Sequence, residues 1–123
     1  MRYLVFAISM PIALAAWSSL PAKLGWAAAT LDTTFGRYQV LRYGLPMPWH
    51  NEYRELMRKR YGVDVRAIAG CVVFGALVDY ASAYNSVSTD AIKRKYGQDI
   101  MERTAREVGS SWRRERVKRK LIE

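Results

Sequence analysis

The sequence predicts a mainly α-helical fold with a small β element (α+β), in which three to four amphipathic helices surround a central apolar helix. The most apolar stretch beyond the N-terminus, residues 70–85, has its large side chains at helical spacing. Segments on either side repeat this spacing, whereas residues 63–69 show most clearly the period of two that indicates a strand. An N-terminal apolar signal or anchor helix is expected to precede this domain.

The N-terminal segment is uncharged from residue 3 to residue 22 and follows a single arginine, Arg2. A short positive start, about fifteen apolar residues and then small residues are typical of an export signal. The same length just meets the roughly 20 residues that a bilayer-spanning helix needs, so an uncleaved anchor is an open alternative. A third interpretation is an apolar helix packed on the domain. We assign residues 1–29 to the signal peptide or membrane anchor with its connector, and expect an exported (periplasmic or secreted) or membrane-anchored protein.

The single folded domain is expected at residues 30–111. Its first clear helix spans residues 48–61, because Tyr53, Met57 and Tyr61 follow one another at spacings of four and Gly62 can end the helix. The predicted strand comes next and needs a partner, since unpaired backbone groups are costly when buried. That partner is either residues 37–43 or a second copy of the chain.

The central helix is defined by an apolar stripe at spacings of four, three, four and three. Its members are Val73, Leu77, Tyr80, Tyr84 and Val87. Leu77 and Tyr84 are expected at the centre of the core, where truncation of Leu77 would be costly. Cys71 is expected to be a small buried hydrophobe. Asp79 is expected at the margin of the stripe, paired with Arg66 or a tyrosine hydroxyl.

A last amphipathic helix is predicted from residue 99 to Trp112, with Asp99 and Glu102 at its start. Met101, Ala105, Val108 and Trp112 form its apolar stripe. Residues 112–123 follow as a basic C-terminal tail, because their apolar residues are too sparse to bury much surface.

The charge of the chain is +9, from 20 Lys and Arg against 11 Asp and Glu. A protein this basic is attracted to polyanions such as phosphate head groups, nucleic acid or acidic proteins. We expect a non-enzymatic domain that binds an acidic partner or an anionic membrane surface; the opposing interpretation of its tail is an unpartnered, solvated terminus. The predicted binding residues are Arg113, Arg114, Arg116, Lys118, Arg119 and Lys120.

Two other functions stay open. The basic C-terminal helix also suits a nucleic-acid-binding module, which is less favoured if the protein is exported. An enzyme with an unrecognised site is the third interpretation, and Asp79 and His50 are the polar residues of such a site. The single His and single Cys provide too few ligands for a histidine–thiolate metal site, so no metal or cofactor is expected. A homo-oligomer is compatible with all three functional interpretations.

Overall fold

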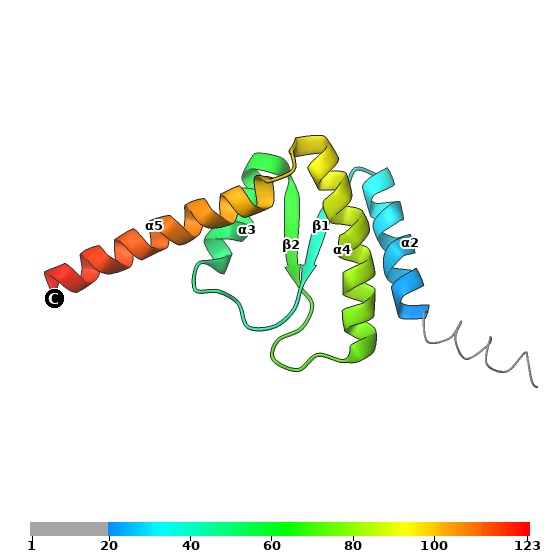
Figure 1. Cartoon of the computed structure of the whole chain (residues 1–123), viewed down its shortest axis with the longest axis horizontal. Helices are drawn as coiled ribbons and strands as arrows, with labels where there is room; N and C mark the ends of the chain where they lie inside the picture. Colours follow the sequence, from blue (N-terminus) through cyan, green and yellow to red (C-terminus); the bar gives the residue numbers. More distant parts are fainter. Residues whose placement is uncertain (1–19) are drawn as a thin grey trace, which may run out of the picture.

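The computed structural model describes residues 20–123, so the predicted signal or anchor lies outside the described residues except at its end. In chain order the elements are α2 (Leu20–Thr34), β1 (Tyr38–Arg42), α3 (His50–Tyr61), β2 (Val63–Ala67), α4 (Gly75–Tyr96) and α5 (Ile100–Ile122). The described part is therefore mainly helical with a small two-stranded sheet, which confirms the predicted fold class at this level (Figure 1).

The sheet is a βαβ unit. β1 and β2 run parallel, with Val40 opposite Val65, and α3 is the crossover between them. Parallel strands need such a crossover because a tight hairpin joins only antiparallel neighbours. Gly62 makes the turn from α3 directly into β2 at φ 65°, a left-handed conformation that glycine adopts without strain. The predicted strand thus pairs with residues 38–42 of its own chain.

The sheet separates two apolar clusters. One face packs against α3 and the junction of α4 with α5 through Val63, Val65, Met57, Ile92 and Ile100. The other face packs against α2 and α4 through Leu41, Ala29, Ala81 and Tyr84. Because alternate strand residues point to opposite faces, β1 supplies Val40 to the first cluster and Leu41 to the second, whereas β2 supplies Val63 and Val65 to the first.

Side chains of α4 cover the outer edge of β1. The Asn85 amide accepts a hydrogen bond from the backbone N–H of Leu41 (2.8 Å) and donates one to the Leu41 carbonyl (2.7 Å). The Ser88 hydroxyl donates to the carbonyl of Gln39. Asn85 therefore substitutes for a neighbouring strand, which satisfies backbone groups that would otherwise be buried without partners. α4 continues without a break through the capping-type residues 86–90 to Tyr96.

The start of the central helix differs from the prediction. α4 begins at Gly75, so Val73 lies in the preceding loop, where the backbone of Phe74 is extended. The stripe predicted from Val73 is consequently displaced: Leu77 is only half-buried. The buried residues of α4 are Ala81, Tyr84, Ser88 and Ile92, so the expectation for Tyr84 is confirmed.

Two single-residue predictions near this helix are wrong. Cys71 is exposed, because it lies in the surface loop that joins β2 to α4. Asp79 is exposed on α4 and has no hydrogen-bond or ion-pair partner among the described residues, so neither Arg66 nor a tyrosine neutralises it. The hydroxyl of Tyr84, further along α4, donates instead to Asp32 at 2.6 Å.

Candidate anion-binding surface

The second half of α5 leaves the body of the protein. The helix is continuous from Ile100 to Ile122, although the sequence predicted a helix only as far as Trp112. All of its buried residues, Ile100, Thr104, Val108 and Gly109, belong to its first half. Every residue after Trp112 is exposed, and Figure 1 shows this part of α5 projecting away from the sheet. The predicted tail is thus an extension of a helix anchored in the core.

The six predicted cations all lie on this exposed part: Arg113, Arg114, Arg116, Lys118, Arg119 and Lys120. Within residues 20–123, Arg119 alone among them pairs with a carboxylate, that of Glu115 at 3.7 Å. Exposed pairs at this spacing contribute only a few tenths of a kcal/mol, so even Arg119 can exchange its partner for another anion. Most of the positive charge on this part of α5 is therefore not neutralised by carboxylates among the described residues.

A bidentate ion pair fixes the root of this extension. Arg60 of α3 donates two hydrogen bonds to the Glu107 carboxylate of α5, at 2.7 and 2.8 Å. The hydrogen bonds from Arg60 lower the pKa of Glu107, and the same bonds raise the pKa of Arg60. Two parallel hydrogen bonds between a planar guanidinium and a carboxylate fix the relative orientation of the two groups as well as their distance. This contact therefore orients α5 relative to α3. It also neutralises a carboxylate that would otherwise weaken the positive field of α5.

An apolar groove lies beside the cations, between α5 and the loop that precedes α3. Its volume is about 470 Å³, and it is lined by Met47, Pro48, Trp49, Ala105, Arg106, Gly109, Trp112, Arg113 and Arg116. The lining contains three arginines and no carboxylate. The Arg116 guanidinium lies 5.2 Å from the centre of the Trp112 ring, within the range of a cation–π contact. Sequence reasoning missed this groove, because the pairing of Trp49 with α5 depends on how the loop at residues 43–49 folds back.

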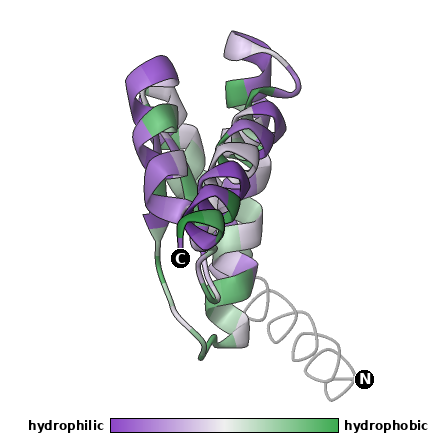
Figure 2. Ribbon diagram, turned by 90° about the vertical axis from the view of Figure 1, so that its left-hand side faces the viewer, coloured by the Kyte–Doolittle hydropathy of each residue, from purple (hydrophilic) through white to green (hydrophobic). Residues whose placement is uncertain are grey.

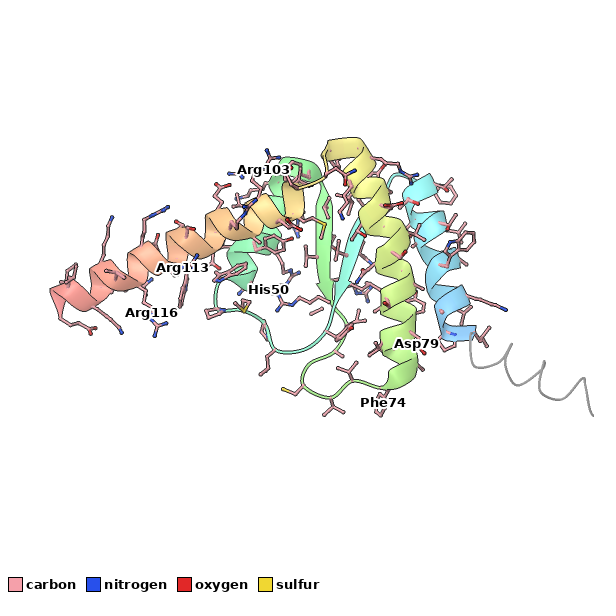
Figure 3. All side chains as sticks on the ribbon, viewed as in Figure 1. His50, Phe74, Asp79, Arg103, Arg113 and Arg116 are labelled. Atoms are coloured by element: carbon pink, nitrogen blue, oxygen red, sulfur yellow. The ribbon has the colours of Figure 1, made fainter. Side chains whose placement is uncertain are left out.

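Gly109 makes the floor of the groove. A Cβ at this position would lie 3.5 Å from the Trp49 indole, so the ring sits directly on the backbone of α5. Trp49 also contacts Tyr53 edge-to-face, with ring centres 6.2 Å apart. These contacts hold the Trp49 indole against the helix. Figure 3 shows Arg113 and Arg116 on the neighbouring turns of α5.

His50 does not form part of this surface or of an acid–base pair. It is the first residue of α3 and is buried, with 7% of its surface exposed. Arg42 donates to its Nδ1 at 2.5 Å and also to the carbonyl of Leu45 at 3.0 Å. Since Nδ1 accepts, the proton of the neutral ring is on Nε2, which is buried without a partner in the described residues. Burial, followed by the charges of Arg42 and Arg54, lowers the pKa of His50.

This environment predicts an acid-sensitive fold. The unfolded chain takes up a proton at His50 below about pH 6.5, whereas the folded protein resists it because the folded pKa is lower. Stability is then fully present above pH 6.5 and falls as the pH is lowered from there toward the folded pKa, by at most about 1.4 kcal/mol per pH unit. Urea unfolding between pH 8 and pH 5.5 measures this slope.

The matched variant is His50→Gln, whose amide oxygen can still accept from Arg42 but does not titrate. Its stability should vary much less over the same pH range, because His50 is the only histidine in the chain. Parallel curves for the two proteins would show that His50 is not the source of the acid sensitivity.

The two polar residues proposed for an unrecognised enzyme site are not brought together. Figure 3 shows His50 beneath α5 and Asp79 near the start of α4, on the far side of the sheet. Among residues 20–123, no group of three His, Cys, Asp or Glu side chains is arranged to hold a metal ion. In the same range, no helix has both the length and the apolarity required to cross a bilayer.

Comparison with known proteins does not add a family. No family model matches the chain, and no curated protein or solved structure matches it.

Proposed function

We propose that this chain is a non-enzymatic, exported or membrane-anchored domain that binds an acidic partner or an anionic surface through the second half of α5. One observation carries the proposal: six cations occupy a helical extension whose residues are all exposed and make no contribution to the core. A folded domain gains nothing in stability from such an extension, and its self-repulsion is unfavourable unless an anion is bound.

The favoured partner is an anionic membrane surface. A Lys or Arg near such a surface contributes about 1 kcal/mol, and the effect decays within a Debye length, so a projecting helix is a suitable carrier. Trp112 at the base of the extension, in cation–π contact with Arg116, adds an amphipathic ring of the type found at membrane interfaces. Export or anchoring through the uncharged N-terminal segment is consistent with this choice and is part of the proposal, while Gly25 and Ala29 of α2 are buried in the domain.

Nucleic acid is the second candidate, and the groove is the observation that favours it. Single-stranded nucleic acids bind proteins by stacking bases on aromatic rings while cations hold the phosphates. Trp49 and Trp112 line the groove together with Arg106, Arg113 and Arg116. This arrangement has both kinds of group, although a cytoplasmic location is needed for it to operate.

The test compares two variants with the same loss of charge. Arg113, Arg116 and Lys120, which lie three and four residues apart on one side of α5, are replaced by glutamine in the first. Binding of the full-length protein to vesicles containing phosphatidylglycerol should weaken about a hundredfold, since about 1 kcal/mol is lost per charge. Sedimentation of vesicles over a salt series measures the change, with pure phosphatidylcholine vesicles as the baseline.

The control replaces Arg54, Arg58 and Lys59, three exposed cations of α3, by glutamine. Arg54 and Arg58 line a pocket together with the carboxylates of Glu55 and Asp64, and all three cations lie outside α5, so their loss should affect binding far less. Equal weakening in both variants would mean that net charge alone drives binding, which contradicts a site on α5. Tight, salt-dependent binding to an oligothymidylate without binding to the vesicles would favour the second candidate.

A further inference from the structure

Large apolar side chains gather at one end of the domain. Leu45, Val72 and Phe74 are each more than 70% exposed, and they belong to the two loops before α3 and before α4. Leu20 and Leu24, at the start of α2, are also exposed. Figure 1 shows both loops and the start of α2 at the lower end of the molecule, and Figure 3 places Phe74 at its tip. We refer to these five residues as the apolar end.

The apolar end is free of charge over long stretches. Neither residues 43–49 nor residues 67–78 contain a single Asp, Glu, Lys or Arg. The backbone N–H of Gly44 donates to the carbonyl of Gly70 at 3.1 Å, so the two loops are joined to each other. An exposed loop of a protein that faces only water is normally polar, and several largely exposed apolar side chains on two joined loops indicate an interaction surface.

The opposite end has the reverse character. α3 and α4 both finish there, with Arg58, Lys59 and Arg60 in the last turn of α3 and Lys93, Arg94 and Lys95 in that of α4. Arg103 marks this upper end in Figure 3. In Figure 2 the upper turns are mostly purple, whereas green residues appear at the lower end. The domain is thus amphipathic along one axis, which a lipid–water boundary would match.

α2 extends the apolar end in an unusual way. It presents small residues to α4: Gly25 and Ala29 are buried, and a Cβ on Gly25 would lie only 2.2 Å from the Tyr80 carbonyl oxygen. Its large residues, Leu24 and Leu31 among them, remain outside and exposed. A helix that packs through small residues and exposes large apolar ones fits an apolar solvent better than water.

We propose that the apolar end is a lipid-binding surface whose loop tips insert into the interfacial region of a bilayer. The chain itself favours lipid over a second copy as the occupant, because the uncharged sequence of residues 3–22 joins the domain at this end. Nineteen residues precede Leu20, and an anchor formed by them would hold this end of the domain next to the bilayer. Lys23 and Trp26, both exposed on α2, are suited to the head-group region.

This inference goes beyond the cationic surface of α5 and does not depend on it. Insertion of apolar side chains requires no anionic lipid, whereas the binding proposed for α5 does. The two are therefore separable by lipid composition as well as by mutation.

The single cysteine provides the test. Cys71 is exposed and adjoins Val72, so a nitroxide attached to it in the full-length protein reports on the loop before α4. On addition of phosphatidylcholine vesicles, collision of the label with oxygen should increase several-fold relative to collision with a water-soluble nickel chelate. The control carries Gln98→Cys with Cys71→Ser, which moves the label to an exposed position at the opposite end, and its label should stay in water.

The second variant combines Val72→Ser with Phe74→Ser. Both side chains are largely exposed, so circular dichroism and the melting temperature should be unchanged while the Cys71 label returns to water. A Cys71 label that stays in water on vesicles would overturn the inference, even if α5 binds anionic lipid. Spin–spin broadening at Cys71 without vesicles would also overturn it, because it would identify a second copy as the occupant.

Discussion

Replacing Gly25 by alanine is expected to destabilise the protein by about 2–3 kcal/mol, despite the better helix propensity of alanine. The new methyl group would lie 2.2 Å from the Tyr80 carbonyl oxygen and 3.0 Å from its carbonyl carbon. These are backbone atoms of α4, so no side-chain rotation relieves the clash and α2 has to move away. Thermal and urea unfolding of the full-length protein measure the loss.

Gly109 is the matched control, since it too is buried in the middle of a helix. A Cβ at Gly109 would meet the Trp49 ring at 3.5–3.6 Å, which is ordinary van der Waals contact. Gly109→Ala should therefore leave stability unchanged or raise it by up to about 1 kcal/mol through helix propensity. Similar losses in both variants would mean that the close packing of α2 on α4 is not what makes Gly25 necessary.

The sequence predicts the elements of this fold better than their packing. The period of two at residues 63–69 identifies β2, and the spacing of Tyr53, Met57 and Tyr61 identifies α3, because both depend on local patterns. The close contact of Gly25 with α4 has no local pattern, since small residues on α2 resemble those of an ordinary connector. Predicting α2 requires knowing that large apolar side chains lie outside and small ones inside, the reverse of the usual rule for a helix in water.

The sequence predicted the cations of the candidate anion-binding surface but not the groove beside them. Counting cations in residues 113–120 locates the charge, because charged residues without apolar neighbours have to be exposed. The groove between Trp49 and Trp112 joins residues more than sixty positions apart, and a single sequence carries no signal for such a contact. The same reason explains the error at Cys71: an apolar local sequence indicates burial only when another element covers it, and none of the described elements covers this loop.

Ile92→Ala is the other substitution with a large expected effect, a loss of about 2–5 kcal/mol in the free energy of unfolding. Ile92 is completely buried, and it packs with Met57, Val65 and Ile100 at the point where three helices meet the sheet. Truncating its side chain leaves a cavity against the face of the sheet that carries Val63 and Val65. The close-packed surroundings can relax only partly to fill this cavity. A loss of this size is a large fraction of the total stability of a domain this small.

Leu77→Ala is the matched substitution on the same helix, and it separates the observed helix from the stripe that the sequence suggested. That stripe places Leu77 at the centre of the core, whereas in the structure it is half-buried in the first turn of α4. Because less apolar surface returns to water, its truncation should cost no more than about 1–2 kcal/mol. Urea unfolding of both variants gives the two losses in the free energy of unfolding, which can then be compared. A loss for Leu77→Ala equal to that for Ile92→Ala would place the start of the buried face one turn earlier than Ala81.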